Sequence, residues 1–351
     1  MKFIHIADVH LGADPDIGNS RQGKRQKEIW DSLERILDIC EEKRTDLLLI
    51  AGDLFHRQPL KRELKELNSM FGRLSVTEVV IIAGNHDYLK RDSYYRTFSW
   101  VENVHMILSS QLSAVEFPQH SLAVYGLSYS SREITEELYK QAVPEGQMDY
   151  KILLAHGGDE MHIPVKKEDL LGLGYDYIAL GHIHKPQQIY PGRIAYAGAL
   201  EPVDKNDTGI HGYIEGEIKG KGCKTVFVPA ASREYVHMEI FVDSRMTGYD
   251  LKEKIKEKIE EKGEQHIYKI ILIGQRDPDT IFDIRSLDSF GNIIEIVDNT
   301  TFAYQFEKLE AKNRENILGR FIESFRGSKE GSIEYQALCE GVHALMETRR
   351  G

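Results

Sequence analysis

The chain has 351 residues, enough for two or three domains, and its 41% apolar and 29% charged residues exclude an intrinsically disordered protein. Its formal net charge of −11 excludes a protein that coats nucleic acid through its overall charge, although a local binding site stays open. Three widely spaced cysteines, and the lack of an apolar run of ~18 residues, predict a cytoplasmic protein with neither a disulfide framework nor a membrane span.

The first hundred residues alternate between short apolar runs and helical patterns. Phe3–Ala7, Leu47–Ala51 and Val79–Ala83 are predicted strands, and residues 26–43 and 61–74 between them place apolar side chains on one helical face. This βαβαβ order predicts a parallel sheet covered by helices on both faces. So many further strands follow that two sheets are expected: Val104–Leu108, Leu122–Tyr125, Ile152–Ala155, Tyr177–Leu180, Ile194–Ala197, Tyr213–Ile218 and Thr225–Val228.

The pattern changes near residue 231. Three strands and one charged helix with a single apolar stripe are predicted there, in the order His237–Val242, Tyr249–Lys262 (helix), Tyr268–Ile273 and Ile293–Val297. This βαββ set predicts a small domain at residues 231–300, after a first domain at residues 1–230. Residues 301–351 have helical spacing, and their apolar face either packs on its own chain or docks a partner.

Side chains that bind metals follow five of the predicted strands. They are Asp8 and His10 after the first strand, Asp53 after the second, Asn85, His86 and Asp87 after the third, and then His156, His182 and His184. Because ligands gather beyond the carboxyl ends of parallel strands, we expect these segments to meet. Each motif alone is typical of a turn or a hydrogen-bonded histidine, but all five in this order favour one shared site. Glycine precedes Asp53, Asn85 and His182, which permits tight turns and a close approach to a metal.

Seven of these side chains form a mixed nitrogen and oxygen ligand set: Asp8, His10, Asp53, Asn85, His156, His182 and His184. Seven ligands are too many for one zinc ion and suit two metal ions that share a carboxylate. The absence of a nearby cysteine disfavours a structural zinc or iron–sulfur site. Two metal ions about 3.5–4 Å apart are suited to in-line attack on phosphorus, so the set predicts a phosphoester hydrolase.

The motifs DVH, GDLFH, GNHD, an isolated histidine and GHIH, in this order, resemble the calcineurin-type metallophosphoesterase superfamily over about residues 1–215. His56 in GDLFH, with the runs GHIHKPQ and YAGALEPVD, is similar to the SbcD-type DNA repair exonucleases of the meiotic recombination eleven nuclease family. The resemblance implies an α/β fold, a four-layer α-β-β-α sandwich. It also implies that residues 231–300 form a DNA-capping domain and that residues 301–351 dock an SbcC-type coiled-coil ATPase.

The resemblance implies a role for each residue of the site. The first metal would be held by Asp8, His10 and His184, the second by Asn85, His156 and His182, and Asp53 would bridge them. His86 and His56 would be catalytic histidines that face the substrate, with Asp87 orienting the ring of His86. Two Mn²⁺ ions are the expected cofactors, and Fe, Zn and Mg stay open.

The activity implied is manganese-dependent hydrolysis of DNA phosphodiester bonds in double-strand-break repair, as a 3′–5′ exonuclease and endonuclease that forms a homodimer. The sequence leaves open the polarity of cleavage, the native metal, the preference for single- or double-stranded ends, the ATP dependence and the oligomeric state. The alternative is a phosphatase or phosphodiesterase for small substrates, whose metal ligands are nearly the same. Such an enzyme needs no segment like the one after residue 231, and this favours the nuclease. A structural subunit whose catalysis has decayed is disfavoured by the intact ligand set.

Basic residues follow the first three metal-binding strands, within a segment of 16 basic and 16 acidic residues at positions 1–100. Two interpretations stay open. The residues either contact DNA phosphates without reading bases, or they are ordinary solvated surface charges. The candidates are Arg21, Lys24, Arg25, Lys27, Arg57, Lys61, Arg62, Lys90 and Arg91.

Overall fold

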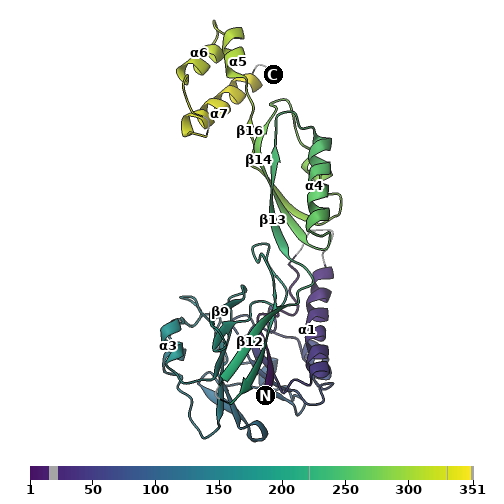
Figure 1. The fold of residues 1–351 in the computed structure, drawn as a ribbon, viewed down its shortest axis with the longest axis vertical. Helices are drawn as coiled ribbons and strands as arrows, with labels where there is room; N and C mark the ends of the chain where they lie inside the picture. The colour runs from purple at the N-terminus through teal and green to yellow at the C-terminus, as the bar shows by residue number, and fades with distance from the viewer. Residues whose placement is uncertain (16–22, 221, 330, 349–351) are drawn as a thin grey trace. The chain divides into compact units, whose positions relative to one another are not determined.

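The computed structural model describes residues 1–15, 23–220, 222–329 and 331–348. The chain divides into two compact units, Met1–Tyr235 and Val236–Gly351 (Figure 1). Within the described ranges, no helix has the length and apolar character that crossing a bilayer requires.

The first unit contains a six-stranded sheet with the order β12-β11-β1-β2-β3-β4. Strands β1 to β4 run parallel, β11 pairs antiparallel with β1, and β12 pairs antiparallel with β11. The bounds are β1 (Lys2–Ile6), β2 (Leu47–Ala51), β3 (Glu78–Ile82), β4 (Val104–Met106), β11 (Gly212–Lys219) and β12 (Gly222–Pro229). The register places Ile50 of β2 between Ile6 of β1 and Ile81 of β3, so the carboxyl ends of these strands lie at one edge of the sheet.

A second six-stranded sheet has the order β5-β6-β7-β8-β10-β9. Its core strands β6, β7, β8 and β10 are parallel, and the two outermost strands, β5 and β9, pair antiparallel with their neighbours. The bounds are β5 (Ser113–Phe117), β6 (Leu122–Gly126), β7 (Tyr150–His156), β8 (Tyr177–Gly181), β9 (Gln187–Tyr190) and β10 (Ile194–Tyr196). The chain therefore forms the two sheets that the number of apolar runs predicts.

Alternate side chains of the strands build three apolar layers. Ile4 of β1 packs under the helices α1 (Lys24–Lys43) and α2 (Lys61–Phe71), while Phe3 packs between the two sheets. The outer face of the second sheet is covered by α3 (Lys167–Leu171), the 3-10 turn Leu138–Gln141 and adjoining loops. Figure 1 shows α1 and α3 on opposite sides of the sheets. The structure confirms the predicted α/β fold with four layers in the order α-β-β-α.

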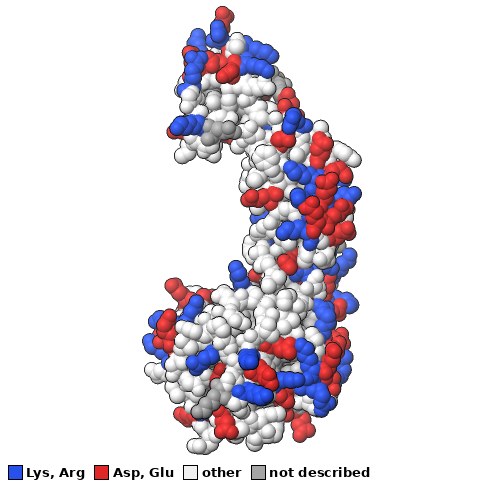
Figure 2. Space-filling model, viewed as in Figure 1, with Lys and Arg blue, Asp and Glu red and all other residues white. Residues whose placement is uncertain are grey.

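The second unit begins with a sheet that packs against one helix. Strands β13 (Tyr235–Val242), β14 (Ile267–Arg276) and β15 (Ile293–Asp298) lie in that order, and β16 (Thr301–Phe302) pairs with β14. The apolar stripe of α4 (Gly248–Lys262) consists of Leu251, Ile255 and Ile259, and all three are fully buried against the sheet. Charged side chains crowd over α4 in Figure 2, which agrees with a helix that buries only one narrow stripe.

Three helices follow, α5 (Phe306–Lys312), α6 (Ile317–Ser324) and α7 (Ile333–Glu347). Their apolar side chains form a small core of their own, in which Leu318 and Ile322 of α6 contact Leu338 and Val342 of α7. Part of the apolar face expected after residue 301 thus packs on its own chain. The division into domains at residues 230 and 300, and the docking role of the last segment, stay predictions.

Candidate metal centre

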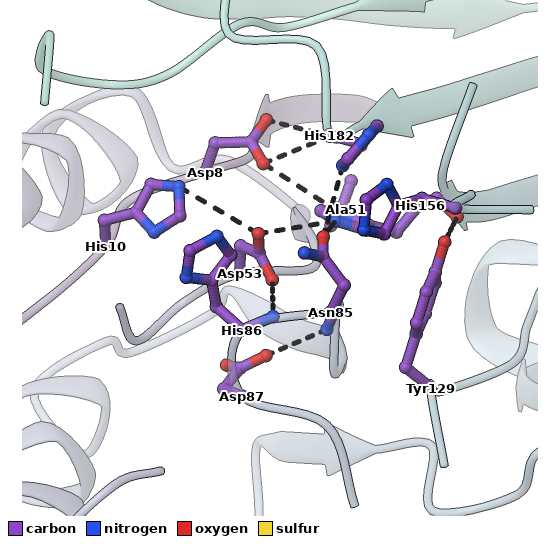
Figure 3. Close-up of polar contacts among 12 residues, drawn as sticks. Asp8, His10, Ala51, Asp53, Asn85, His86, Asp87, Tyr129, His156 and His182 are labelled. Atoms are coloured by element: carbon purple, nitrogen blue, oxygen red, sulfur yellow. Dashed lines mark hydrogen bonds and ion pairs between the residues drawn. The ribbon is translucent and has the colours of Figure 1, made fainter. Parts of the chain in front are cut away.

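The structure brings all seven predicted metal ligands together at the carboxyl ends of five strands. They come from the loops after β1, β2, β3 and β8 and from the last residue of β7, as Figure 3 shows for most of them. Two groups of three ligands are especially close. One consists of Asp8, His10 and His184, and the other of Asp8, Asp53 and His156. Within each group, the ligand atoms lie within 4.8 Å of one another. Asp8 belongs to both groups, so the two clusters form one continuous site.

The backbone is strained at four of these seven residues. The φ angles are 49° at Asp8, 52° at His10, 49° at Asp53 and 97° at His182. Residues other than glycine rarely adopt such angles, and they persist only where surrounding contacts enforce them. Here the amide of His10 donates to the carbonyl of Asp53 at 3.0 Å, which ties the first loop to the second. The strain turns the side chains at the strand ends toward a common point.

The glycines that precede the ligands leave room for neighbouring ligands. A Cβ atom on Gly84 would lie 2.2 Å from Oδ1 of Asp53, and one on Gly52 would lie 2.4 Å from Nδ1 of His156. Both separations are shorter than any real contact, so a larger residue would displace the ligand. These glycines let the ligand side chains of neighbouring loops approach one another closely, and their expected role in close approach to a metal stays a prediction.

The first group of ligands surrounds the ring of His10. Nε2 of His10 lies 3.1 Å from Nε2 of His184 and 3.9 Å from Oδ2 of Asp53. Nδ1 of His184 donates to Oδ2 of Asp207 at 2.9 Å, which leaves the Nε2 lone pair of His184 facing His10. Two ring nitrogens that face each other at this distance need a proton or a metal ion between them.

The second group surrounds the ring of His156. Its Nδ1 donates to the carbonyl of Ala51 at 2.8 Å, and its Nε2 lies 3.0 Å from Oδ1 of Asn85 and 3.5 Å from Oδ2 of Asp53. Nδ1 of His182 lies 3.2 Å from the same Asn85 oxygen. Because two oxygen acceptors face Nε2 of His156, this nitrogen needs either a proton or a metal ion between it and them.

The pKa shifts of the buried groups also bear on whether the cluster can bind cations. Burial lowers the pKa of His156, but the carboxylates of Asp53 and Asp8 outweigh it and raise that pKa to about 9. Burial raises the pKa of Asp8 to about 6, although His156 and His184 oppose the change. The raised pKa of His156 thus shows that the neighbouring carboxylates favour positive charge at this point of the cluster. Oxygen and imidazole donors of this number and burial fit two divalent cations.

Two further histidines lie at the accessible edge of the cluster. The ring centroids of His86 and His56 lie 4.8 Å and 5.3 Å from that of His10, and 5.0 Å from each other. His56 is exposed and His86 is half-buried, whereas His10 is buried. That both rings face a substrate stays a prediction.

The role expected for Asp87 is wrong. The Asp87 carboxylate is fully buried and accepts hydrogen bonds from the amides of Gly84 at 2.8 Å and Phe55 at 3.1 Å, and from the Tyr95 hydroxyl at 2.9 Å. Nδ1 of His86 instead donates to the carbonyl of His56 at 3.0 Å. Asp87 thus braces the loops that carry Asn85 and His56, and a backbone carbonyl orients the His86 ring.

Several residues that contact the ligands were missed by sequence reasoning. Asp207 accepts from His184, as described above, and Oδ2 of Asp159 accepts from Nε2 of His182 at 2.7 Å. The hydroxyls of Tyr129 and Tyr139 donate to the carbonyl of His156 at 3.1 Å and 3.3 Å. Asp159 could have been noticed, since it follows His156 within the run HGGD. Asp207 and the tyrosines have no such local signal.

The basic candidates separate into distinct environments. Lys24, Lys61, Lys90 and Arg91 are exposed, whereas Arg57 donates to both carboxylate oxygens of Glu63, at 3.0 Å and 2.6 Å. Arg21 lies outside the described residues. The exposed lysines are therefore better placed to meet an anion than Arg57.

The expectation that Arg25 contacts DNA is wrong. Its side chain is fully buried and donates to Glu28 at 2.6 Å, to Glu201 at 3.3 Å and to the carbonyl of Pro202 at 2.9 Å. A buried guanidinium requires such partners, because an unpaired charge in the interior is very costly. Arg25 fastens α1 to the segment after β10 that leads to Asp207.

The similarity to known proteins covers the part of the chain that contains the site. A sequence model described as calcineurin-like phosphoesterase matches residues 1–186, which include all seven clustered side chains. The chain is 30% identical over 237 residues to an uncharacterized metallophosphoesterase, YhaO, of Bacillus subtilis, covering 60% of this chain and 57% of that one.

Two archaeal proteins named DNA double-strand break repair protein Mre11 are also similar. The one from Methanocaldococcus jannaschii is 30% identical over 236 residues, covering 63% of this chain and 61% of that one. The one from Methanopyrus kandleri is 27% identical over 238 residues, covering 60% of this chain and 52% of that one. The matches thus span between about half and three-fifths of the length of these three relatives.

Proposed function

The chain belongs to the calcineurin-like phosphoesterase family, and we propose that it is a two-metal nuclease that hydrolyses phosphodiester bonds in DNA. Membership and the clustered donors support a metal-dependent phosphoester hydrolase. The choice of DNA as substrate, and a place in double-strand-break repair as an SbcD-type nuclease, are the proposal. It rests above all on one observation, the seven-donor cluster with His56 and His86 at its accessible edge.

We assign the ligands to two metal ions as the resemblance implies. Asp8, His10 and His184 would hold the first ion, and Asn85, His156 and His182 would hold the second, while Asp53 lies near His10 and His156 of the two groups. When bound, the two ions neutralise the phosphodiester and activate water for in-line attack. Manganese is the ion we propose, because the donors combine carboxylate and amide oxygens with imidazole.

His86 is the residue we propose to act on the leaving oxygen. Its Nδ1–H is committed to the carbonyl of His56, so the opposite nitrogen, Nε2, is the atom available to a substrate. Its amide donates to Oδ1 of Asp53 at 2.8 Å, which fixes the ring beside the metal cluster. A protonated Nε2 donates its proton to the oxygen that departs from phosphorus. His56, which is exposed beside it, binds a non-bridging oxygen of the same phosphate.

Two observations support a polymeric substrate over a small one. The exposed side chains Lys24, Lys61, Lys90 and Arg91 follow the loops of the metal cluster, where they meet successive phosphates. Two relatives of 27–30% identity carry the name of a DNA double-strand break repair protein. We further propose that the protein acts in the cytoplasm as a homodimer with a coiled-coil ATPase of the SbcC type.

A direct comparison of substrates tests the proposal. The metal-free full chain is supplied with Mn²⁺, Mg²⁺, Zn²⁺ or Fe²⁺, and is offered linear duplex DNA labelled at either end of one strand, circular single-stranded DNA, a chromogenic phosphodiester and a cyclic nucleotide. The expected result is release of nucleotides from the 3′ end of the duplex and slower cutting of the circle, with Mn²⁺ most active. Rapid hydrolysis of the cyclic nucleotide with intact DNA would instead establish a small-substrate phosphodiesterase.

A further inference from the structure

Two carboxylates outside the ligand set each bind one histidine of the cluster. Oδ2 of Asp207, in the segment between β10 and β11, accepts Nδ1–H of His184 at 2.9 Å. Oδ2 of Asp159, in the loop after β7, accepts Nε2–H of His182 at 2.7 Å. The two histidines belong to different halves of the cluster, so each half has its own carboxylate.

The two contacts use opposite ring nitrogens. A neutral imidazole carries one N–H, and the hydrogen bond that this N–H makes decides which nitrogen offers a lone pair. Asp207 takes Nδ1–H of His184, so Nε2 faces His10 at 3.1 Å. Asp159 takes Nε2–H of His182, so Nδ1 faces Oδ1 of Asn85 at 3.2 Å. The reverse tautomer of either ring would turn an N–H toward the metal position.

Both carboxylates are themselves held in place by backbone amides. Oδ1 of Asp159 accepts from the amides of Met161 at 2.8 Å and His162 at 2.9 Å, and the ring of His162 donates from Nδ1 at 2.9 Å. Oδ2 of Asp207 accepts from the amides of Val203 at 3.1 Å and Asp204 at 3.2 Å. A carboxylate fixed in this way holds a ring in one orientation, and a mobile one cannot.

We propose that Asp159 and Asp207 are positioning residues that set the affinities of the two metal sites separately. Asp207 acts on the site that contains His184, and Asp159, supported by His162, acts on the site that contains His182. Each carboxylate fixes the tautomer of its histidine and makes the ring a stronger donor. This inference needs only the metal cluster, so it holds or fails independently of the substrate.

Metal titration of the full chain is the test. Binding of Mn²⁺ to the metal-free protein is followed by calorimetry for the parent, for Asp159→Asn and for Asp207→Asn. Asparagine keeps the shape and an acceptor oxygen but removes the charge. Each variant is expected to weaken one of two binding steps by about 10–100-fold and to leave the other unchanged. The matched controls are Glu160→Gln, which changes the exposed neighbour of Asp159, and Glu217→Gln, which changes an exposed acid of β11, the strand that follows the segment with Asp207. Both controls should bind metal as the parent does.

A second set of variants assigns each effect to its site. In a His182→Ala background Asp159→Asn should cause no further loss, because its histidine is gone, while Asp207→Asn should still weaken the remaining site. A His184→Ala background should give the opposite result. This crossed pattern is one that a general change of charge or of folding cannot produce.

Three results would overturn the proposal. Equal weakening of both steps by either variant would make the effect one of net charge. Unchanged affinity in both variants would deny any positioning role. Binding of a third Mn²⁺ that Asp159→Asn alone abolishes would make Asp159, His162 and His182, whose ligand atoms lie within 4.8 Å of one another, a separate ion site. Thermal unfolding of each metal-free variant, with Asp159→Glu and Asp207→Glu as charge-keeping substitutes, shows that lost affinity is not lost structure.

Discussion

Acidic residues of both units bind backbone amides close in sequence, but in the first unit those at strand ends also bind amides of distant segments. In the second unit carboxylates bind backbone amides close in sequence, as Asp288 does with the amide of Gly291 three residues on, and Asp298 with that of Thr300 two residues on. In the first unit the acids at strand ends reach across the fold. Asp53 accepts from the amide of His86, 33 residues away, and Asp8 from that of His182, 174 residues away. Local contacts of the first kind stabilise turns, and long-range contacts of the second kind build a site.

Backbone strain is divided in the same way. Among the described residues, every non-glycine residue with positive φ lies in the first unit, and four of these seven belong to the metal cluster. Strain of this kind costs about 1–3 kcal/mol per residue and persists where the fold enforces it. The first unit thus gives up stability to bring its ligands together, whereas the second unit does not.

Removing the Asp53 carboxylate should have the largest effect on the metal cluster. Asp53→Asn removes the group that contacts both halves of the cluster, and we expect it to abolish binding of at least one metal ion and to reduce cleavage to background. Metal content by mass spectrometry and a nuclease assay measure this. Two tightly bound ions in the variant would contradict the bridging assignment.

Changing His86 should separate chemistry from metal binding. His86→Gln removes the ring proposed to protonate the leaving oxygen, so cleavage should fall by about 100–10,000-fold while both metal ions stay bound. Single-turnover cleavage and calorimetry on the same sample provide the two readouts. Undiminished cleavage would remove His86 from the mechanism.

The core of the second unit should be separable from the site. Ile255→Ala deletes a fully buried side chain of α4 and should destabilise that unit by about 2–5 kcal/mol. Because the cluster consists wholly of first-unit residues, Mn²⁺ affinity should not change. Chemical denaturation and metal titration test both halves of this prediction, and a weakened metal site would show that the units depend on each other.

Removal of the metal ions should destabilise the first unit and leave the second unchanged. Mn²⁺ at 100 times its dissociation constant should stabilise the first unit by about 2.7 kcal/mol for each ion bound, because the ions bind only its folded form. Hydrogen exchange with and without a chelator should therefore differ in β1, β2 and β7 but not in α4. Equal protection of both units by Mn²⁺ would contradict a site confined to the first.

Single surface lysines should have the smallest effect. Lys61→Ala or Lys90→Ala should weaken DNA binding similarly for all sequences. Each should also reduce the slope of log affinity against log salt concentration by about one unit. Lys167→Ala in α3, where the side chain is exposed over the other sheet, is the matched control. An unchanged slope in both test variants would show that these lysines are ordinary surface charges that do not contact DNA.

How far the sequence could predict these features depends on where each residue finds its partners. Strands β1 to β3 and the seven ligands were predictable, because apolar runs and the residues that follow them are local signals. The edge strands β5 and β9 were not predicted, since polar residues such as Glu116 and Gln187 interrupt their apolar pattern. Their pairing is decided by the neighbouring strands β6 and β10.

Long-range partners explain the wrong and missing assignments. Arg25 has the spacing of a surface residue, and only Glu201, 176 residues away, reveals that it is buried. The His86 ring is held by a carbonyl 30 residues earlier, a contact that no motif encodes. Asp207 lies 23 residues from the histidine that it orients. Such contacts follow from the tertiary fold and cannot be read from spacing alone.

We propose that side chains from five separate segments form one two-metal centre. Anomalous diffraction at the manganese edge from crystals of the full chain grown with Mn²⁺ tests it most directly. We expect two peaks about 3.5–4 Å apart, with Asp53 between them and His184 and His182 on opposite sides. A single peak, or peaks away from Asp53, would contradict it.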